Sequence, residues 1–217
     1  MALKLYAHPF SSYCQKVLIA LYENATPFEL RMFGLPEVDA ELAALWPLKK
    51  IPLLVNGDKT VMESTVIIEH LELHYPGPVK LLPDDPNTCL EVRFMDCFFD
   101  NHIMSPMQIP VAEMLKTKGA RKAEAMAEAR QALDTAYSWL ELRLAHRTWA
   151  IGDTFTMADC AAAPSLFYAD WVHPINDTFG NVRSYRQRLL ARPSYARAVE
   201  EARPFRKNFP LGAPDRD

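Results

Sequence analysis

The stretch from Ser11 to Cys14 brings two hydroxyls and a thiol to the start of an apolar segment with helical spacing. A hydroxyl at a helix N-terminus can donate a hydrogen bond to a bound anion, which the helix dipole also favours. The spacing Ser11-x-x-Cys14 is that of a redox CxxC site whose first thiol is replaced by serine, so a dithiol cycle cannot close within it. Taken alone, the spacing leaves Ser11 open as an ordinary loop or cap residue or as a hydrogen-bond donor to an anion, and we expect Cys14 to be a small buried residue of the helix.

Two later pairs of residues could bind the charged ends of a small ligand. Lys49 and Lys50 stand directly before Ile51-Pro52, and Glu63-Ser64 stands at the start of another apolar segment with helical spacing. An acid followed by a hydroxyl suits the N-terminus of a helix as a cap. The same pair suits a ligand that carries an ammonium and a carboxylate group. Taken alone, the pair leaves the choice between capping and binding open.

His70 and His74 are four residues apart on a predicted helix and could share a metal ion. However, Leu71 stands where a metalloprotease needs a glutamate, and the sequence suggests no third ligand. We therefore expect no metal site.

The elements that must position these residues are of two kinds. In the first third of the chain, alternation at residues 3–7 and 28–32, helical spacing after Ser11 and at 40–45, and a hairpin at Asn56-Gly57 predict a small mixed sheet with helices. The helix that begins at Ser64 is expected to cover this sheet with Val66, Ile67, Leu71 and Leu73.

A proline-rich segment at 77–88 is predicted to be a linker, and the chain beyond it is predicted to be helical. Helices are expected at 88–116 and 120–144, at a capping box formed by Thr156 and Asp159, and in two shorter segments, the second opened by Pro193. We expect the arginines between 183 and 206 to form a solvated helix face and residues 204–217 to fray.

Composition limits the class of protein. The chain has 217 residues, of which 49% are apolar and 24% charged, and a net charge of −3 at pH 7, as expected of a globular protein. The acidic balance argues against a nucleic-acid or anionic-membrane binder, and no apolar run approaches the ~20 residues that span a bilayer. The first residues lack the apolar core of a signal peptide, and four cysteines without paired spacing favour reduced thiols. We therefore expect a cytoplasmic protein.

Three motifs together carry a resemblance to a known family. The stretches LYAHPFSSYCQKVLIAL, LKKIPLLVNGDKTVMESTVIIEHL and IGDTFTMADCAAAP stand in the order and spacing of the cytosolic glutathione transferases, of the serine type found in bacteria. The resemblance implies an α/β plus all-α fold, with a thioredoxin-like βαβαββα domain at 1–76, a linker at 77–88 and a helical bundle domain at 89–217. It also implies a homodimer without nucleic-acid or membrane partners.

The resemblance assigns roles to residues of the first domain. Ser11 falls where serine-type members carry the catalytic hydroxyl. Tyr6 is the alternative donor, as in tyrosine-type members, although its place inside a strand favours a packed ring. The residues implied to bind glutathione are Lys50, with Lys49 as its alternative, Ile51, cis-Pro52, Glu63 and Ser64. Trp46 replaces the family's usual asparagine near the glycine end of glutathione.

Glutathione is implied as co-substrate, without any other cofactor and without a metal. Its thiol is ionised to only about 3% at neutral pH, so the protein must stabilise the thiolate for attack on a small electrophilic, apolar acceptor. Phe10, Met104, Met107 and Trp171 are candidates for the acceptor pocket, with ordinary core packing as the alternative. A glutathione-dependent isomerase or disulfide reductase, or a non-catalytic binding protein, would use the same site.

Overall fold

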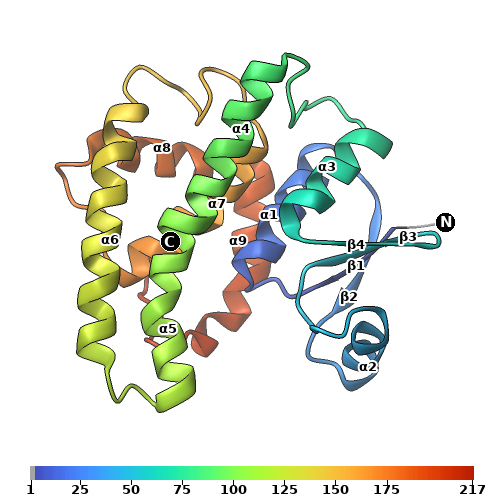
Figure 1. Ribbon diagram of the computed structural model, residues 1–217, viewed down its shortest axis with the longest axis horizontal. Helices are drawn as coiled ribbons and strands as arrows, with labels where there is room; N and C mark the ends of the chain where they lie inside the picture. The colour runs from blue at the N-terminus through green and yellow to red at the C-terminus, as the bar shows by residue number, and fades with distance from the viewer. Residues whose placement is uncertain (1–2) are drawn as a thin grey trace.

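The computed structural model describes residues 3–217, which form a four-stranded sheet with helices on both faces, beside a larger helical part (Figure 1). The strands are β1 (Leu3–Ala7), β2 (Phe28–Met32), β3 (Leu53–Asn56) and β4 (Lys59–Met62), in the spatial order β2-β1-β3-β4. β1 is parallel to β2 and antiparallel to β3, which pairs with β4 in a hairpin. The predicted fold class is thereby confirmed.

Two apolar layers pack helices against the sheet. α1 (Ser12–Glu23) and α3 (Ser64–His74) cover one face, and α2 (Pro36–Leu45) covers the other. Because side chains alternate along a strand, Leu5 faces α1 whereas Tyr6 faces α2, where it packs with Val38 and Leu42. The turn of the β3–β4 hairpin lies at residues 57–58, one residue later than expected, with Gly57 at a φ of 64°.

Only part of the predicted inner face of α3 covers the sheet. Ile67 and Leu71 are buried, together with Ile68, but Val66 is 52% and Leu73 is 77% exposed. Val66 and Leu73 are seven residues apart, which is about two helical turns, so they share the outer face of the helix. Two large apolar side chains therefore project from α3 to the surface.

The rest of the chain is helical. Its elements are α4 (Pro86–Phe98), the π-helical turn η1 (Phe99–Met104), α5 (Ser105–Thr117), α6 (Lys122–Arg143), α7 (Met157–Val172), α8 (Gly180–Ala191), α9 (Pro193–Ala202) and the 3-10 turn η2 (Arg203–Asn208). The predicted helix at 88–116 thus contains a π-helical turn, and it begins inside the predicted linker, because Pro86 suits a first helical position. The domain limits 1–76, 77–88 and 89–217 stay a prediction.

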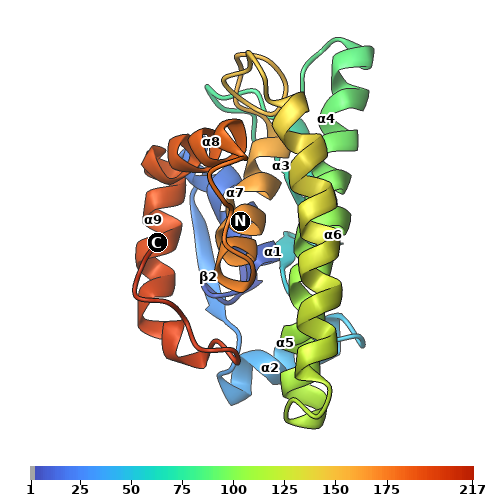
Figure 2. The same cartoon turned by 90° about the vertical axis from the view of Figure 1, so that its left-hand side faces the viewer.

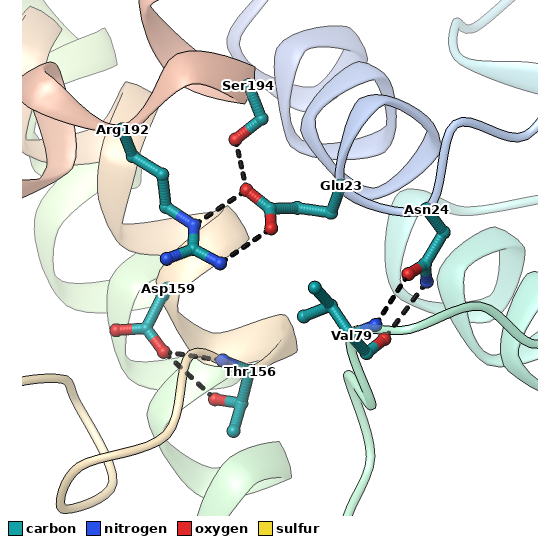
Figure 3. Close-up of polar contacts among 7 residues, drawn as sticks. All are labelled: Glu23, Asn24, Val79, Thr156, Asp159, Arg192 and Ser194. Atoms are coloured by element: carbon teal, nitrogen blue, oxygen red, sulfur yellow. Dashed lines mark hydrogen bonds and ion pairs between the residues drawn. The ribbon is translucent and has the colours of Figure 1, made fainter.

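α7 is the central helix of this part, and Figure 2 shows it between α6 on one side and α8 and α9 on the other. It begins at the predicted capping box: the Asp159 carboxylate accepts hydrogen bonds from Thr156 N (2.8 Å) and Thr156 Oγ1 (3.1 Å), as drawn in Figure 3. The same carboxylate accepts from Ala150 N and from the Tyr185 hydroxyl. One fully buried acid therefore fixes the start of α7 against α8 and the preceding loop.

The sheet side and the helical side are joined by polar contacts at the end of α1 (Figure 3). Glu23 accepts two hydrogen bonds of 2.6 Å from the Arg192 guanidinium and one from the Ser194 hydroxyl. The guanidinium also lies 3.9 Å from the centre of the Phe155 ring. The expectation of a purely solvated arginine face is therefore wrong at Arg192, because its charge is paired across the interface. It is also wrong at Arg186, whose side chain is only 11% exposed.

The segment after α3 and the C-terminal segment are both fixed by side chains. The Asn24 side chain exchanges two hydrogen bonds with the backbone of Val79 (Figure 3). Near the end of the chain, Arg216 pairs with Asp170 of α7, and Asp217 pairs with Arg203. The prediction that residues 204–217 fray is therefore wrong, because ion pairs and the turn η2 order this segment. Within residues 3–217, no helix combines the length and the apolar character needed to cross a membrane.

Candidate active site

A cavity of about 400 Å³ lies between the sheet side and the helical side and contains all the residues predicted to bind glutathione. On the sheet side its lining residues are Trp46, Lys50, Ile51, Pro52, Met62, Glu63, Ser64 and Thr65. On the helical side they are Asp100, Asn101 and Gln108, and Tyr13 of α1 completes the wall. We call it the first cavity. Lys49 is exposed and is not among its lining residues, so Lys50 is the lysine that the geometry places there.

Two unusual backbone conformations shape this cavity. The Ile51–Pro52 peptide bond is cis, and it turns the chain so that Ile51 reaches the cavity wall just before β3 begins. Glu63 has a φ of 66°, a region that non-glycine residues rarely adopt. Ser64 and Thr65 then open α3, so the N-terminal end of that helix lies at the cavity wall. The cavity therefore offers a carboxylate, hydroxyls and a helix N-terminus, which suit a ligand carrying both charges.

A buried ion cluster, which the sequence interpretation missed, lies beneath the first cavity. Lys16 Nζ of α1 lies 2.7 Å from Asp96 Oδ1 and 2.8 Å from Asp100 Oδ2, and it donates to Thr65 Oγ1 at 2.9 Å. Thr65 in turn donates to Asp96 Oδ2 at 2.7 Å. We call these four residues the Lys16 cluster. They connect α1, α3, α4 and η1, and two of them, Thr65 and Asp100, line the cavity.

The Lys16 cluster combines one amine with two carboxyl groups. Burial alone would lower the pKa of Lys16, but the two carboxylates outweigh it and raise the pKa, so the lysine stays protonated. Two carboxylates share this one cation, and Asp100 faces the cavity with a 20% exposed side chain. Burial raises the pKa of Asp100, while the Lys16 ammonium acts in the opposite direction. The Lys16 cluster therefore places an acidic group, paired with Lys16, at the floor of the first cavity. The signal in the sequence was a lysine inside an apolar helix, with two acids four residues apart on a later one.

Ser11 lies at the N-cap position of α1, in the loop that follows β1. Its side chain makes no capping hydrogen bond to the helix backbone, and its amide donates to the carbonyl of His8 (3.0 Å). The backbone of this residue is therefore fixed, while its hydroxyl is not used to cap the helix.

Cys14 is fully buried one turn into α1. Burial raises the pKa of its thiol to about 11, although a hydrogen bond with Ser11 acts in the opposite direction. A protonated, inaccessible thiol is a poor nucleophile, so this environment favours the interpretation of Cys14 as a packed residue.

Ser11 lines a second cavity of about 420 Å³, which shares Tyr13 and Gln108 with the first. The other lining residues are Phe10, Ser12, Met107, Val111, Ala112, Leu115, Tyr168, Asn208, Phe209 and Pro210. Among these described lining residues there is no lysine, arginine, aspartate or glutamate. The second cavity is therefore suited to an uncharged, largely apolar molecule placed next to Ser11.

Of the four residues predicted for the acceptor pocket, Phe10 and Met107 are among the lining residues of the second cavity. Met104 is not, because η1 turns its side chain into the core, where it is 1% exposed. Trp171 lies one layer further back, with its ring 6.3 Å from that of Phe10 and 5.3 Å from that of Tyr168. It supports the wall without lining it.

Tyr6, the alternative catalytic donor, lies on the opposite face of the sheet. Its side chain is buried against α2, and its hydroxyl donates to Glu41 Oε2 at 2.9 Å. Burial raises the pKa of Tyr6, and the Glu41 carboxylate adds to this. Tyr6 lines neither cavity. This placement favours Ser11 as the donor, and the role itself stays a prediction.

His70 and His74, the two residues considered as metal ligands, lie one turn apart on α3. The His70 and His74 rings lie 4.4 Å apart, and His70 Nε2 contacts the Asn56 side chain. In the part of the chain that the structure describes, no three histidine, cysteine, aspartate or glutamate side chains form a group that could hold a metal ion.

Comparison with known proteins agrees with this arrangement. The family model "Glutathione S-transferase, N-terminal domain" matches residues 5–79, and "Glutathione S-transferase, C-terminal domain" matches residues 123–188. The two models together cover more than half of the chain, on the sheet side and on the helical side. The chain therefore belongs to the glutathione S-transferase family.

Individual relatives include enzymes with different names. A probable maleylacetoacetate isomerase of Vibrio cholerae is 27% identical over 214 residues, covering 94% of this chain and 98% of its own. Glutathione S-transferase U22 of Arabidopsis thaliana is 31% identical over 144 residues, covering 66% and 62%. The crystal structure of a glutathione S-transferase of Methylobacterium radiotolerans, in complex with glutathione sulfonate, is 30% identical, with a TM-score of 0.76 and coverage of 92% and 95%.

Proposed function

We propose that this protein is a glutathione transferase that binds glutathione in the first cavity and an uncharged electrophile in the second. The observation that carries the proposal is the position of Ser11: it lines the second cavity two residues before Tyr13, which lines both cavities, and its hydroxyl does not cap its helix. A thiol placed there receives a hydrogen bond from this hydroxyl and lies near the N-terminus of α1. Lowering the thiol pKa by two units needs about 2.7 kcal/mol, which these two contributions can supply.

The first cavity supports a defined orientation of glutathione. The γ-glutamyl ammonium is expected to meet Glu63 and Asp100, and its carboxylate to meet Ser64 and the start of α3. The backbone of Ile51 would pair with the cysteinyl residue like an added strand. Lys50 is then left for the glycine carboxylate. Each charged group of the tripeptide therefore has an opposite charge or a helix N-terminus to contact.

The second cavity favours conjugation over isomerisation of an anionic substrate. Maleylacetoacetate carries two carboxylate groups, and the relative named for it is 27% identical to this chain. The described residues that line the second cavity offer such a substrate no cation. Burying an unpaired carboxylate costs several kcal/mol. An apolar acceptor avoids this cost, so transfer to an uncharged electrophile is the reaction that fits.

We also propose that the protein forms a homodimer through the outer faces of α3, α4 and α6. Large apolar side chains are exposed there, namely Val66, Leu73, Leu90, Phe94, Trp139 and Leu142. The ion pairs Glu69–Arg93 and Glu91–Arg143 show that these three helices lie side by side. An exposed apolar face of this kind is typical of an interface between subunits. Sedimentation velocity at micromolar protein is expected to give twice the mass of one chain, and a single-chain mass would contradict the proposal.

The test of function combines binding with turnover. Calorimetry with glutathione should show binding, and turnover should be measured with an aryl halide, an activated alkene, a peroxide and a mixed disulfide. Conjugation of the aryl halide or the alkene supports the proposed transferase. Turnover of the disulfide alone would replace it with a reductase. Glutathione binding without any turnover would indicate a non-catalytic binding protein.

A further inference from the structure

The carbonyl groups of the loop that carries Ser11 accept hydrogen bonds from two side chains, Gln15 of α1 on the sheet side and Tyr168 of α7 on the helical side. The side-chain amide of Gln15 donates to the carbonyl of Pro9 at 2.8 Å, and the Tyr168 hydroxyl donates to the carbonyl of Phe10 at 3.0 Å. Gln15 also donates to the oxygen of Tyr168 at 3.1 Å, which links the two contacts. Both side chains are almost completely buried. The two carbonyls that precede Ser11 are thus satisfied by one connected pair of side chains.

The amide groups of the same loop are satisfied locally. Phe10 N donates to Nδ1 of His8 at 3.1 Å, and Ser11 N donates to the carbonyl of His8 at 3.0 Å. These bonds shape the loop but do not fix its position relative to the helical side. Among these bonds of the described loop, the one from the Tyr168 hydroxyl to the Phe10 carbonyl reaches α7, 158 residues further along the chain.

Tyr168 is well suited to fix the loop. Burial raises the pKa of its phenol far above the usual value, so the group remains a hydrogen-bond donor at neutral pH. The helix that carries it, α7, is buried along nearly its whole length and is fixed at its start by Asp159. The Tyr168 ring also lies edge-to-face with that of Phe10, with centres 5.5 Å apart.

We propose that Tyr168 is a positioning residue for the reaction: its hydroxyl, together with Gln15, holds the Pro9–Phe10 carbonyls so that Ser11 faces the thiol of bound glutathione. This inference rests on the proposed transferase function. Tyr168 also lines the second cavity. The acceptor therefore contacts the same side chain that positions the thiolate donor, which couples occupation of the second cavity to the geometry of Ser11.

The test uses a variant that removes a single oxygen atom. Tyr168→Phe keeps the ring and deletes the hydroxyl. Tyr195→Phe is the matched control, because the Tyr195 hydroxyl is equally buried but forms no hydrogen bond with the described residues. Two measurements are made on each variant: amide hydrogen exchange at Phe10 and Ser11, and steady-state kinetics with glutathione and an aryl halide.

We expect Tyr168→Phe to accelerate exchange at Phe10 and Ser11 and to lower kcat about 2- to 10-fold, with the KM for glutathione unchanged. The control should match the wild type in both measurements. Gln15→Met, on another helix, should act in the same direction, because it removes the bond to Pro9. General structural damage would instead change both kinetic constants and exchange throughout the chain.

Two outcomes would overturn the inference. It is overturned if Tyr168→Phe behaves like Tyr195→Phe in exchange, or if kcat falls while exchange at Phe10 and Ser11 stays unchanged, since Tyr168 would then act directly on the acceptor. If the wild type shows no conjugation, the transferase proposal fails separately. Amide exchange then decides alone whether Tyr168 fixes the loop.

Discussion

The two cavities, which share Tyr13 and Gln108, are built in different ways. The sheet-side wall of the first comes mainly from two short stretches, residues 50–52 and 63–65, which contain unusual backbone conformations and four charged or polar side chains among their six residues. The second is enclosed by side chains from the Ser11 loop, α5, α7 and residues 208–210, most of them apolar. Local backbone geometry thus defines the first cavity, and packing between distant helices defines the second. Substitutions in the first cavity should therefore change stability and glutathione binding. Substitutions in the second cavity should change the choice of acceptor.

The largest effect is expected beneath the first cavity. Lys16→Met leaves the buried carboxylates of Asp96 and Asp100 without a cation, which should lower the free energy of unfolding by about 3 to 5 kcal/mol. Lys122→Met, at an exposed position of α6, is the control and should change it by less than about 0.5 kcal/mol. Urea unfolding measures both. Equal stabilities of the two variants would show that the Lys16 cluster does not stabilise the fold.

The next largest effect concerns the binding of glutathione. Glu63→Ala should weaken binding by about 10- to 150-fold, because a charge-assisted contact with the ammonium group is worth roughly 1.5 to 3 kcal/mol. Glu63→Gln keeps the shape and removes the charge, so it separates the two contributions. Calorimetry measures the affinity. If a folded Glu63→Ala variant binds as tightly as the wild type, the first cavity does not recognise the ammonium through this residue.

A similar or smaller loss is expected at Ser11. Ser11→Ala should slow conjugation at neutral pH about 10- to 100-fold and leave glutathione affinity nearly unchanged, because the rest of the tripeptide keeps its contacts. Loss of the donor raises the pKa of the bound thiol by roughly one to two units. The thiolate is then formed only at higher pH, so raising the pH should partly restore the rate.

The control for the serine variant is Tyr6→Phe. It should leave the thiol pKa unchanged, because the Tyr6 hydroxyl is bonded to Glu41 on the other face of the sheet. The absorbance of the bound thiolate, measured against pH, gives the thiol pKa in both variants. A shift with Tyr6→Phe and none with Ser11→Ala would transfer the donor role to the tyrosine.

The smallest effect is expected in the second cavity. Val111→Ala shortens an apolar side chain of its wall and should raise the KM for an aryl halide about fourfold for each methylene-sized group that no longer touches the acceptor. Glutathione affinity should not change, because Val111 does not line the first cavity. Kinetics with each substrate varied in turn measures the difference. An equal change for both substrates would mean that the two cavities are not independent.

The sequence predicted the first cavity better than the second, for a physical reason. Ile51-Pro52 and Glu63-Ser64 are neighbours in the chain, so a short motif contains the local geometry. The wall of the second cavity depends on how helices pack. Helical spacing alone could not distinguish Met107, which lines this cavity, from Met104, which the π-helical turn places in the core.

Buried pairing was also beyond prediction from spacing. Lys16 and its acids, like Glu23 and Arg192, lie far apart in the chain, and only the fold shows that they meet. The C-terminal segment is a second example. Its proline and charge content predicted fraying, because the sequence does not show that Asp217 pairs with Arg203 and Arg216 with Asp170.

The contact between Glu23 and Arg192 has a consequence for the time course of synthesis. The two residues are 169 positions apart, and the acids that pair with Lys16 also follow the whole sheet. At about 5 to 20 residues per second, the ribosome produces α1 roughly 10 to 30 s before the arginine that neutralises its last acid. During that interval the apolar face of the nascent α1 is not covered and its charges are not paired. The emerging chain is therefore expected to bind chaperones. Residues 1–76 expressed alone should accordingly show no cooperative thermal transition; a sharp one would mean that the sheet folds before its helical neighbour exists.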